Sequence, residues 1–186
     1  MAKSKPLFSV QTICQMALLI ALEIVFNRFL SINTQALKIG FAFVPIVLCA
    51  VLFGPLHAAI AYAIADTIGA LLLNTVGGPY IPGITLSCAM MGIMYGVFLQ
   101  PLLFSENGKL TKIQIMRIIC PVAINCMVFG LALNSFWLSL AYSSRSFYYF
   151  LTTRLIEYAI LIPVQIILIP LIITVAKRLR RYTVIH

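Results

Sequence analysis

The chain has 186 residues, of which 62% are hydrophobic and only 9% are charged. A soluble domain carries roughly 25% charged residues, so this chain could not cover its surface with solvated side chains, and we expect an integral membrane protein in a lipid bilayer. The formal net charge of +9 then reports orientation in the bilayer, and we expect no nucleic-acid partner.

Long apolar runs predict an all-α membrane protein, a compact bundle of six transmembrane helices in a single domain that spans residues 1–186. In chain order the predicted spans are residues 10–30, 38–53, 56–73, 84–104, 113–142 and 148–176. Most of these runs reach the ~20 residues that a bilayer requires. The second is short and is interrupted by Pro45.

The lysines and arginines are distributed unevenly over the two sides of this bundle. Six spans put both termini on one side, and that side collects nine of the 13 basic residues, namely Lys3, Lys5, Lys109, Lys112, Arg117, Lys177, Arg178, Arg180 and Arg181. The opposite side holds Arg28, Lys38, Arg145 and Arg154. Cytoplasmic loops carry an excess of Lys and Arg. We therefore expect both termini in the cytoplasm and the connections after the first, third and fifth spans outside.

The sharpest break in the apolar pattern is the stretch from Pro79 to Ser87, between the third and fourth spans. Prolines and glycines in and around it do not continue a helix. Backbone groups freed at membrane depth must be satisfied by protein or by a water-lined cavity. Either this stretch, with Pro82, Gly83 and Ser87, forms the floor of a small-molecule pocket that opens outward, or it is a plain loop.

The outward ends of the spans carry basic, amide and aromatic side chains. Arg28, Lys38 and Arg154 run against the positive-inside trend, so either they reach toward outer headgroups or they bind an anionic ligand. Amide and aromatic candidates for the same site are Phe43, Asn74, Tyr80, Asn134 and Trp137. The last two lie one turn apart on one helix face.

Two carboxylates and a pair of alanines inside the spans also need a partner. Asp66 and Glu23 are costly in a membrane, so they serve either as polar contacts between helices or as a path for a proton or cation. Ala17 and Ala21 form a small-xxx-small step that lets another helix approach closely. That helix belongs either to this bundle or to a partner subunit.

No recognised catalytic, nucleotide-binding or metal-binding motif occurs in the sequence. The five cysteines are scattered through the apolar runs and the two histidines are far apart, which excludes the usual ligand spacings. We expect no catalytic residue, no metal, no cofactor and no enzymatic activity. The pattern favours a binding subunit that depends on another protein for energy.

The chain resembles the substrate-binding (S) subunits of energy-coupling factor (ECF) vitamin transporters over nearly its whole length. The resemblance rests on the size, the six spans, the alanine step and three segments, namely residues 38–45, residues 52–55 with 65–70, and residues 82–87. Residues 133–138 and 154–157 resemble the folate-specific members of that family. The resemblance implies vitamin uptake through a bacterial cell membrane, with ATP hydrolysed by partner subunits in an ABC-type complex.

The resemblance also implies roles for particular residues. The outward loops would hold the vitamin, the loop after the first span would act as a gate, and Ala17 and Ala21 would meet a membrane scaffold subunit that carries two cytoplasmic ATPases. Folate has a flat pterin, an aromatic middle and two carboxylates. The expected contacts are stacking by Phe43, Tyr80 or Trp137, pterin hydrogen bonds from Asn74, Ser87 or Asn134, and carboxylate binding by Arg28, Lys38 or Arg154.

Other functions remain open at this point. The vitamin could be riboflavin, thiamine, pantothenate or a queuosine precursor. The chain could instead be a proton-coupled carrier or an intramembrane enzyme that uses Asp66 and Glu23, although two lone carboxylates make a poor acid–base pair. A purely structural membrane subunit would leave the outward Arg, Asn and Trp residues without a purpose.

Overall fold

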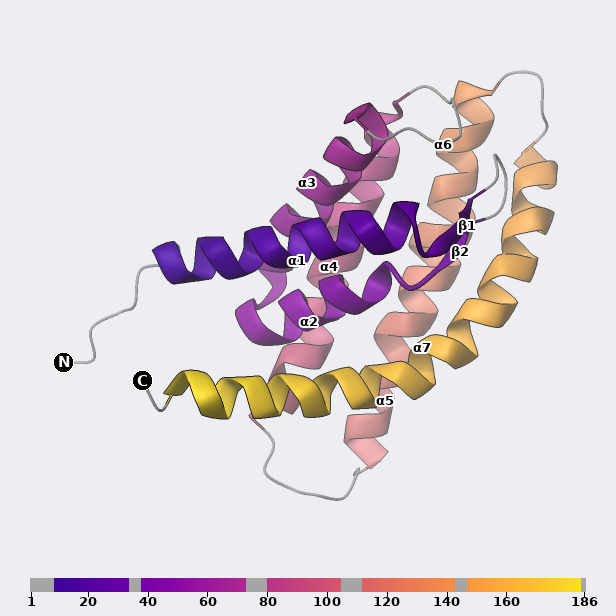
Figure 1. Cartoon of the computed structure of the whole chain (residues 1–186). Coiled ribbons are helices and arrows are strands. Elements are labelled where there is room, and N and C mark those ends of the chain that lie inside the picture. Colours follow the sequence, from indigo (N-terminus) through magenta and orange to yellow (C-terminus); the bar gives the residue numbers. More distant parts are fainter. Residues whose placement is uncertain (1–8, 34–37, 73–79, 105–111, 143–146, 185–186) are drawn as a thin grey trace.

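The computed structural model describes residues 9–33, 38–72, 80–104, 112–142 and 147–184 (Figure 1). The helices are α1 (Val10–Arg28), α2 (Phe43–Phe53), α3 (Pro55–Leu72), α4 (Pro82–Leu103), α5 (Lys112–Ile124), the π-helix η1 (Asn125–Leu133), α6 (Asn134–Ala141) and α7 (Phe147–Val184). Two short strands, β1 (Ser31–Asn33) and β2 (Lys38–Gly40), pair antiparallel between α1 and α2. The prediction of a helical membrane bundle is confirmed, with the addition of this hairpin.

Five of the helical segments are long and apolar enough to cross a membrane, and α5, η1 and α6 form one of them. The predicted second span, residues 38–53, is wrong in its first part, because residues 38–40 form β2 and the helix begins only at Phe43. Pro45 is tolerated because it lies in the first turn of α2. At about 1.5 Å per residue, the 11 residues of α2 cover only about 16 Å, roughly half of a bilayer core.

The helix ends alternate between two sides of the molecule (Figure 1). One side, which we call the terminal end, holds the start of α1 and the ends of α2, α4 and α7. The Arg180 guanidinium lies 4.2 Å from the centre of the Phe104 ring, which joins the ends of α7 and α4 there. The other side, the hairpin end, holds β1 and β2 with the end of α3 and the starts of α4 and α7. The start of α1 and the end of α7 thus lie on the same side of the bundle.

The helices α3 and α4 pack closely because small residues line their contact. A Cβ atom on Gly92 would lie 2.7 Å from the carbonyl oxygen of Ala58, and one on Gly96 would lie 2.3 Å from the Cα of Pro55. Small residues let membrane helices approach closely. This contact fixes α4 against α3 and positions the residues that both helices present to the bundle interior.

Helix α7 has 38 residues, almost twice the length that a bilayer requires. It bends near its middle and passes along the bundle toward the terminal end (Figure 1). Pro163 and Pro170 lie inside it and account for the bend, since proline removes a backbone hydrogen bond and displaces the preceding turn. The basic residues predicted to follow the last span continue the same helix.

Candidate functional site

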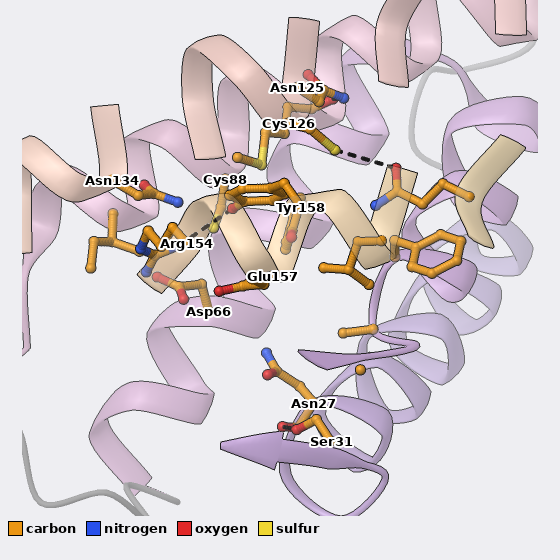
Figure 2. A pocket seen from close by; sticks show the side chains of 18 of the residues that line it. Asn27, Ser31, Asp66, Cys88, Asn125, Cys126, Asn134, Arg154, Glu157 and Tyr158 are labelled. Carbon is orange, nitrogen blue, oxygen red and sulfur yellow. Dashed lines mark hydrogen bonds between the residues drawn. The ribbon is translucent and has the colours of Figure 1, made fainter. Parts of the chain in front are cut away.

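A cavity of about 140 Å³ lies between the helices in the half of the molecule near the hairpin end (Figure 2). Two walls have regular helical spacing. On α4 the lining residues are Ile84, Cys88, Met91 and Tyr95, and on α7 they are Arg154, Glu157, Tyr158, Leu161 and Gln165. From the first to the last lining residue each series rises by 11 steps, so the lining extends over about 16 Å along each helix at 1.5 Å per residue.

The remaining walls come from most of the other helices and from the hairpin. Asn27, Ser31, Gly40, Ala42 and Phe43 close the cavity from α1, the hairpin and the start of α2, Tyr62 and Asp66 line it from α3, and Asn125, Cys126 and Asn134 line it from η1 and α6. The close pairing of Ser31 with Gly40 depends on glycine, because a Cβ atom on Gly40 would lie 2.4 Å from that of Ser31.

The outer part of the cavity, nearest the hairpin end, combines one cation with a carboxylate and an amide. Arg154 donates a hydrogen bond of 3.3 Å to the hydroxyl of Tyr158, one turn further along α7. The Nε of Arg154 and the Oδ1 of Asn134 are buried and have no hydrogen-bond partner among the described residues. Buried polar groups are normally paired, so both atoms are available to a ligand.

Asp66 is held at this outer part by a chain of hydroxyl groups. Its Oδ2 accepts a hydrogen bond of 2.6 Å from Thr85 on α4, and the Thr85 hydroxyl lies 3.1 Å from that of Tyr80. Because the single proton of Thr85 is given to the carboxylate, Tyr80 is the donor in the second bond. Asp66 therefore makes the polar contact between helices that was one of its two predicted roles. It also lines the cavity.

The inner part of the cavity is lined by neutral polar groups. Tyr95 donates a hydrogen bond of 2.8 Å to the Oε1 of Gln165, which also lies 3.9 Å from the Cys126 sulfur. The Asn125 amide donates to the carbonyl of Met91 at 3.3 Å. The Oδ1 of Asn125 has no partner among the residues that the structure describes.

Glu23, the second intramembrane carboxylate, is fully buried on α1. Its Oε1 accepts a hydrogen bond of 2.9 Å from the amide of Asn27, which lines the cavity, and the carbonyl of Asn27 accepts one from Ser31. The bond from Ser31 to Asn27 connects β1 of the hairpin to α1. The proton path considered for Glu23 and Asp66 is not tested by this geometry.

Three of the predicted site residues line the cavity, namely Phe43, Asn134 and Arg154. In the stretch from Pro79 to Ser87, Pro79 lies outside the described residues, whereas Pro82 begins α4 as its first residue and Gly83 and Ser87 follow within the helix. The Ser87 hydroxyl donates to the carbonyl of Gly83 at 3.0 Å and is thus satisfied inside α4.

Trp137 and Tyr80 lie beside the cavity and are not among its lining residues. The Trp137 ring packs on the backbone of Gly83, where a Cβ atom would lie 2.1 Å from the indole. Tyr80 contacts the cavity wall only indirectly, through its hydrogen bond to Thr85, which in turn donates to Asp66. Asn74 and the side chains of Arg28 and Lys38 fall outside the described residues, so binding by these three stays a prediction.

Several lining residues were missed from the sequence. They are Asn27, Ser31, Tyr62, Tyr95, Asn125, Glu157, Tyr158 and Gln165. The spacing of Arg154, Tyr158 and Gln165 on one face of α7 could have identified part of this set. Among the described residues, no cluster of three or more His, Cys, Asp and Glu side chains could hold a metal ion.

Ala17 and Ala21 are exposed on α1. The buried residues of the same helix, Met16, Leu19 and Glu23, lie on its other face. The alanine step therefore does not pack inside this bundle, and the alternative of docking against another protein remains as a prediction.

Comparison with known proteins identifies the family. The family described as ECF-type riboflavin transporter, S component, matches residues 7–177. The chain belongs to this family. It is thus a substrate-binding component of a membrane transporter and not an enzyme, and it resides in the cell membrane as a multi-pass protein.

Relatives of this S component include two folate transporters and two solved structures. It is 35% identical to the folate transporter FolT of Clostridium novyi (strain NT) over 86% of each chain. It is 31% identical to FolT of Leuconostoc mesenteroides subsp. mesenteroides, over 81% of this chain and 78% of that one. The crystal structure of FolT bound with folic acid matches with a TM-score of 0.72 at 34% identity, over 86% of this chain and 90% of the other. An S component for biotin shares the fold, with a TM-score of 0.62 at 20% identity over 92% of each chain.

Proposed function

We propose that this S component binds folate at the outer face of the cell membrane and delivers it, together with a membrane scaffold subunit and two ATPases, to the cytoplasm. The observation that carries the proposal is its likeness to FolT, at 35% identity in sequence and at a TM-score of 0.72 to FolT bound with folic acid. The likeness to the biotin S component is at only 20% identity and supports the fold alone.

The lining of the cavity offers chemistry that suits folate. Its extent of about 16 Å along α4 and α7 suits an elongated molecule with a flat ring at one end. The neutral polar groups of Tyr95, Asn125 and Gln165 suit the donors and acceptors of a buried pterin. Arg154, nearer the hairpin end, suits a carboxylate of the glutamate tail.

Binding by the purified protein tests this proposal. Titration calorimetry with folic acid, supported by native mass spectrometry of the protein as isolated, is expected to show one folate per chain. Riboflavin, thiamine, pantothenate and biotin serve as competitors and are expected to leave folate binding unchanged. A protein that binds one of these vitamins and neither oxidised nor reduced folate would overturn the assignment of folate and keep the family.

We further propose that the terminal end of the bundle faces the cytoplasm. The excess of Lys and Arg on the tails and on the even-numbered connections supports this orientation. Reaction of Lys177→Cys with a membrane-impermeant maleimide, in a protein whose five native cysteines are replaced by serine, tests it in intact cells. Labelling is expected only after the membrane is opened, and labelling in intact cells would reverse the orientation.

A further inference from the structure

The wall formed by η1 and α6 does not follow the spacing of the other two long walls. Its lining residues are Asn125, Cys126 and Asn134. In an α-helix of 3.6 residues per turn, positions nine residues apart differ by about 900°, and therefore point in opposite directions. Asn125 and Asn134 nevertheless line the same cavity, with only 2% and 7% of their surfaces exposed.

The π-helix resolves this contradiction. Residues 125–133 are π-helical, and the backbone N–H of Asn134 donates to the carbonyl of Phe129, five residues before it. A π-helix has roughly 4.4 residues per turn, so that nine residues complete about two full turns. The wider turn thus brings Asn134 round to the side of the helix on which Asn125 lies.

The exposure of the intervening residues agrees with this register. An α-helix that began at Asn125 would turn residues 132 and 136 toward the cavity, at spacings of seven and 11 residues. Both Ala132 and Phe136 are exposed instead, with 51% of the Phe136 surface accessible. The register is held against α7 by Gly130, where a Cβ atom would lie 2.2 Å from the Tyr158 hydroxyl.

The two amides share a further property that points to a ligand. Each has a buried Oδ1 without a hydrogen-bond partner among the described residues. The amide nitrogen of Asn125 is engaged with the carbonyl of Met91, which leaves its oxygen as the free group. A buried acceptor without a donor destabilises the structure, and a ligand that supplies N–H donors at both places would remove this cost.

We propose that the π-helix η1 sets the ligand specificity of the cavity by presenting two amide oxygens, of Asn125 and Asn134, in a row along which an elongated ligand with N–H donors lies. The two residues are at most about 13 Å apart along the helix axis. In folate, Asn125 accepts from the pterin in the inner part of the cavity, and Asn134 accepts from the linker near the carboxylates. This inference rests on the proposed function and states which groups of that site recognise the ligand.

Two substitutions and a control test the row of amides. Asn125→Leu and Asn134→Leu are each expected to weaken folic acid binding by about tenfold or more, while Gln100→Leu, which removes an amide next to Gly54 and outside the cavity, changes it less than twofold. The short ligand 6-carboxypterin, measured by competition, is expected to lose affinity with Asn125→Leu only. Unchanged folic acid binding in Asn134→Leu, or an equal loss for both ligands, would overturn the proposal.

Moving one amide tests the register itself. In the pair Asn134→Ala with Ala132→Asn, the amide stands where an α-helix would present it to the cavity. We expect no recovery of binding over Asn134→Ala alone, because position 132 is exposed in the π register. Recovery would show that the segment is α-helical in the functioning protein. If the unmodified protein binds a vitamin other than folate, the same variants are measured with that vitamin, so the two proposals fail separately.

Discussion

The hydroxyl chain behind Asp66 offers a sharp test of how the cavity is organised. Thr85→Val keeps the shape of the side chain and removes only the O–H that donates to the carboxylate at 2.6 Å. Asp66 then loses the contact that fixes its orientation toward the cavity. A ligand that approaches this carboxylate with an N–H donor must order it again, and this costs affinity.

The size of the effect follows from the strength of the bond. A hydrogen bond to a charged group contributes about 1.5–3 kcal/mol, and 1.4 kcal/mol corresponds to about tenfold in affinity. Asp66 and Thr85 are only partly buried, so the lower value applies, and we expect a loss of about tenfold. Tyr80→Phe removes the second bond of 3.1 Å and should cost no more than about threefold, because both partners there are neutral.

Titration calorimetry with folic acid measures these losses, and Thr85→Ser is the matched control because it restores the hydroxyl without the methyl group. Binding by Thr85→Ser is expected within about twofold of the unmodified protein. Equal losses for Thr85→Ser and Thr85→Val would assign the effect to the methyl group. Full binding by Thr85→Val, together with a loss in Asp66→Asn, would show that the carboxylate needs no support from α4.

Three more predictions concern packing and docking. Gly92→Val should lower the free energy of unfolding by about 2 kcal/mol or more, because the new side chain meets the backbone of α3; an unchanged melting temperature in detergent would contradict this. Trp137→Ala should lower the melting temperature and change the folate Kd less than about threefold, since the indole covers Gly83 beside the cavity, and a tenfold loss would place the ring against the ligand. Tryptophan at both Ala17 and Ala21 should abolish uptake in cells and spare binding by the purified protein, whereas surviving uptake would move the scaffold contact elsewhere.

The course of the helices was predictable because a bilayer imposes long apolar segments. The predicted first, third and fourth spans agree with α1, α3 and α4 to within two residues at each end. The failure at residues 38–53 also has a physical cause. Lys38 to Gly40 directly precedes the apolar run from Phe41, but these residues pair with β1 in a short hairpin, and such pairing leaves no mark in local hydropathy.

The site was less predictable, because its members come from seven helices and two strands and few of them are unusual by themselves. Asn134 and Arg154 were found because amides and cations are rare in apolar runs. Tyr95 and Tyr158 were missed because a tyrosine in a membrane helix usually packs with its neighbours. Trp137 suggested a stacking surface because it is a lone tryptophan at the outer end; the structure places it over Gly83, beside the cavity, and its stacking on a ligand stays a prediction.

The π-helix shows why helical periodicity alone misleads at this site. With α-helical spacing, Asn125 and Asn134 point in opposite directions, so a sequence argument assigns one to the cavity and the other to lipid. An unpaired amide in lipid would be costly, and that cost is itself a signal. Two asparagines that an α-helix cannot bury together, in a segment with Gly130 between them, favour a change of helical register at this place. The same reasoning applies to any membrane helix whose polar residues cannot share one α-helical face.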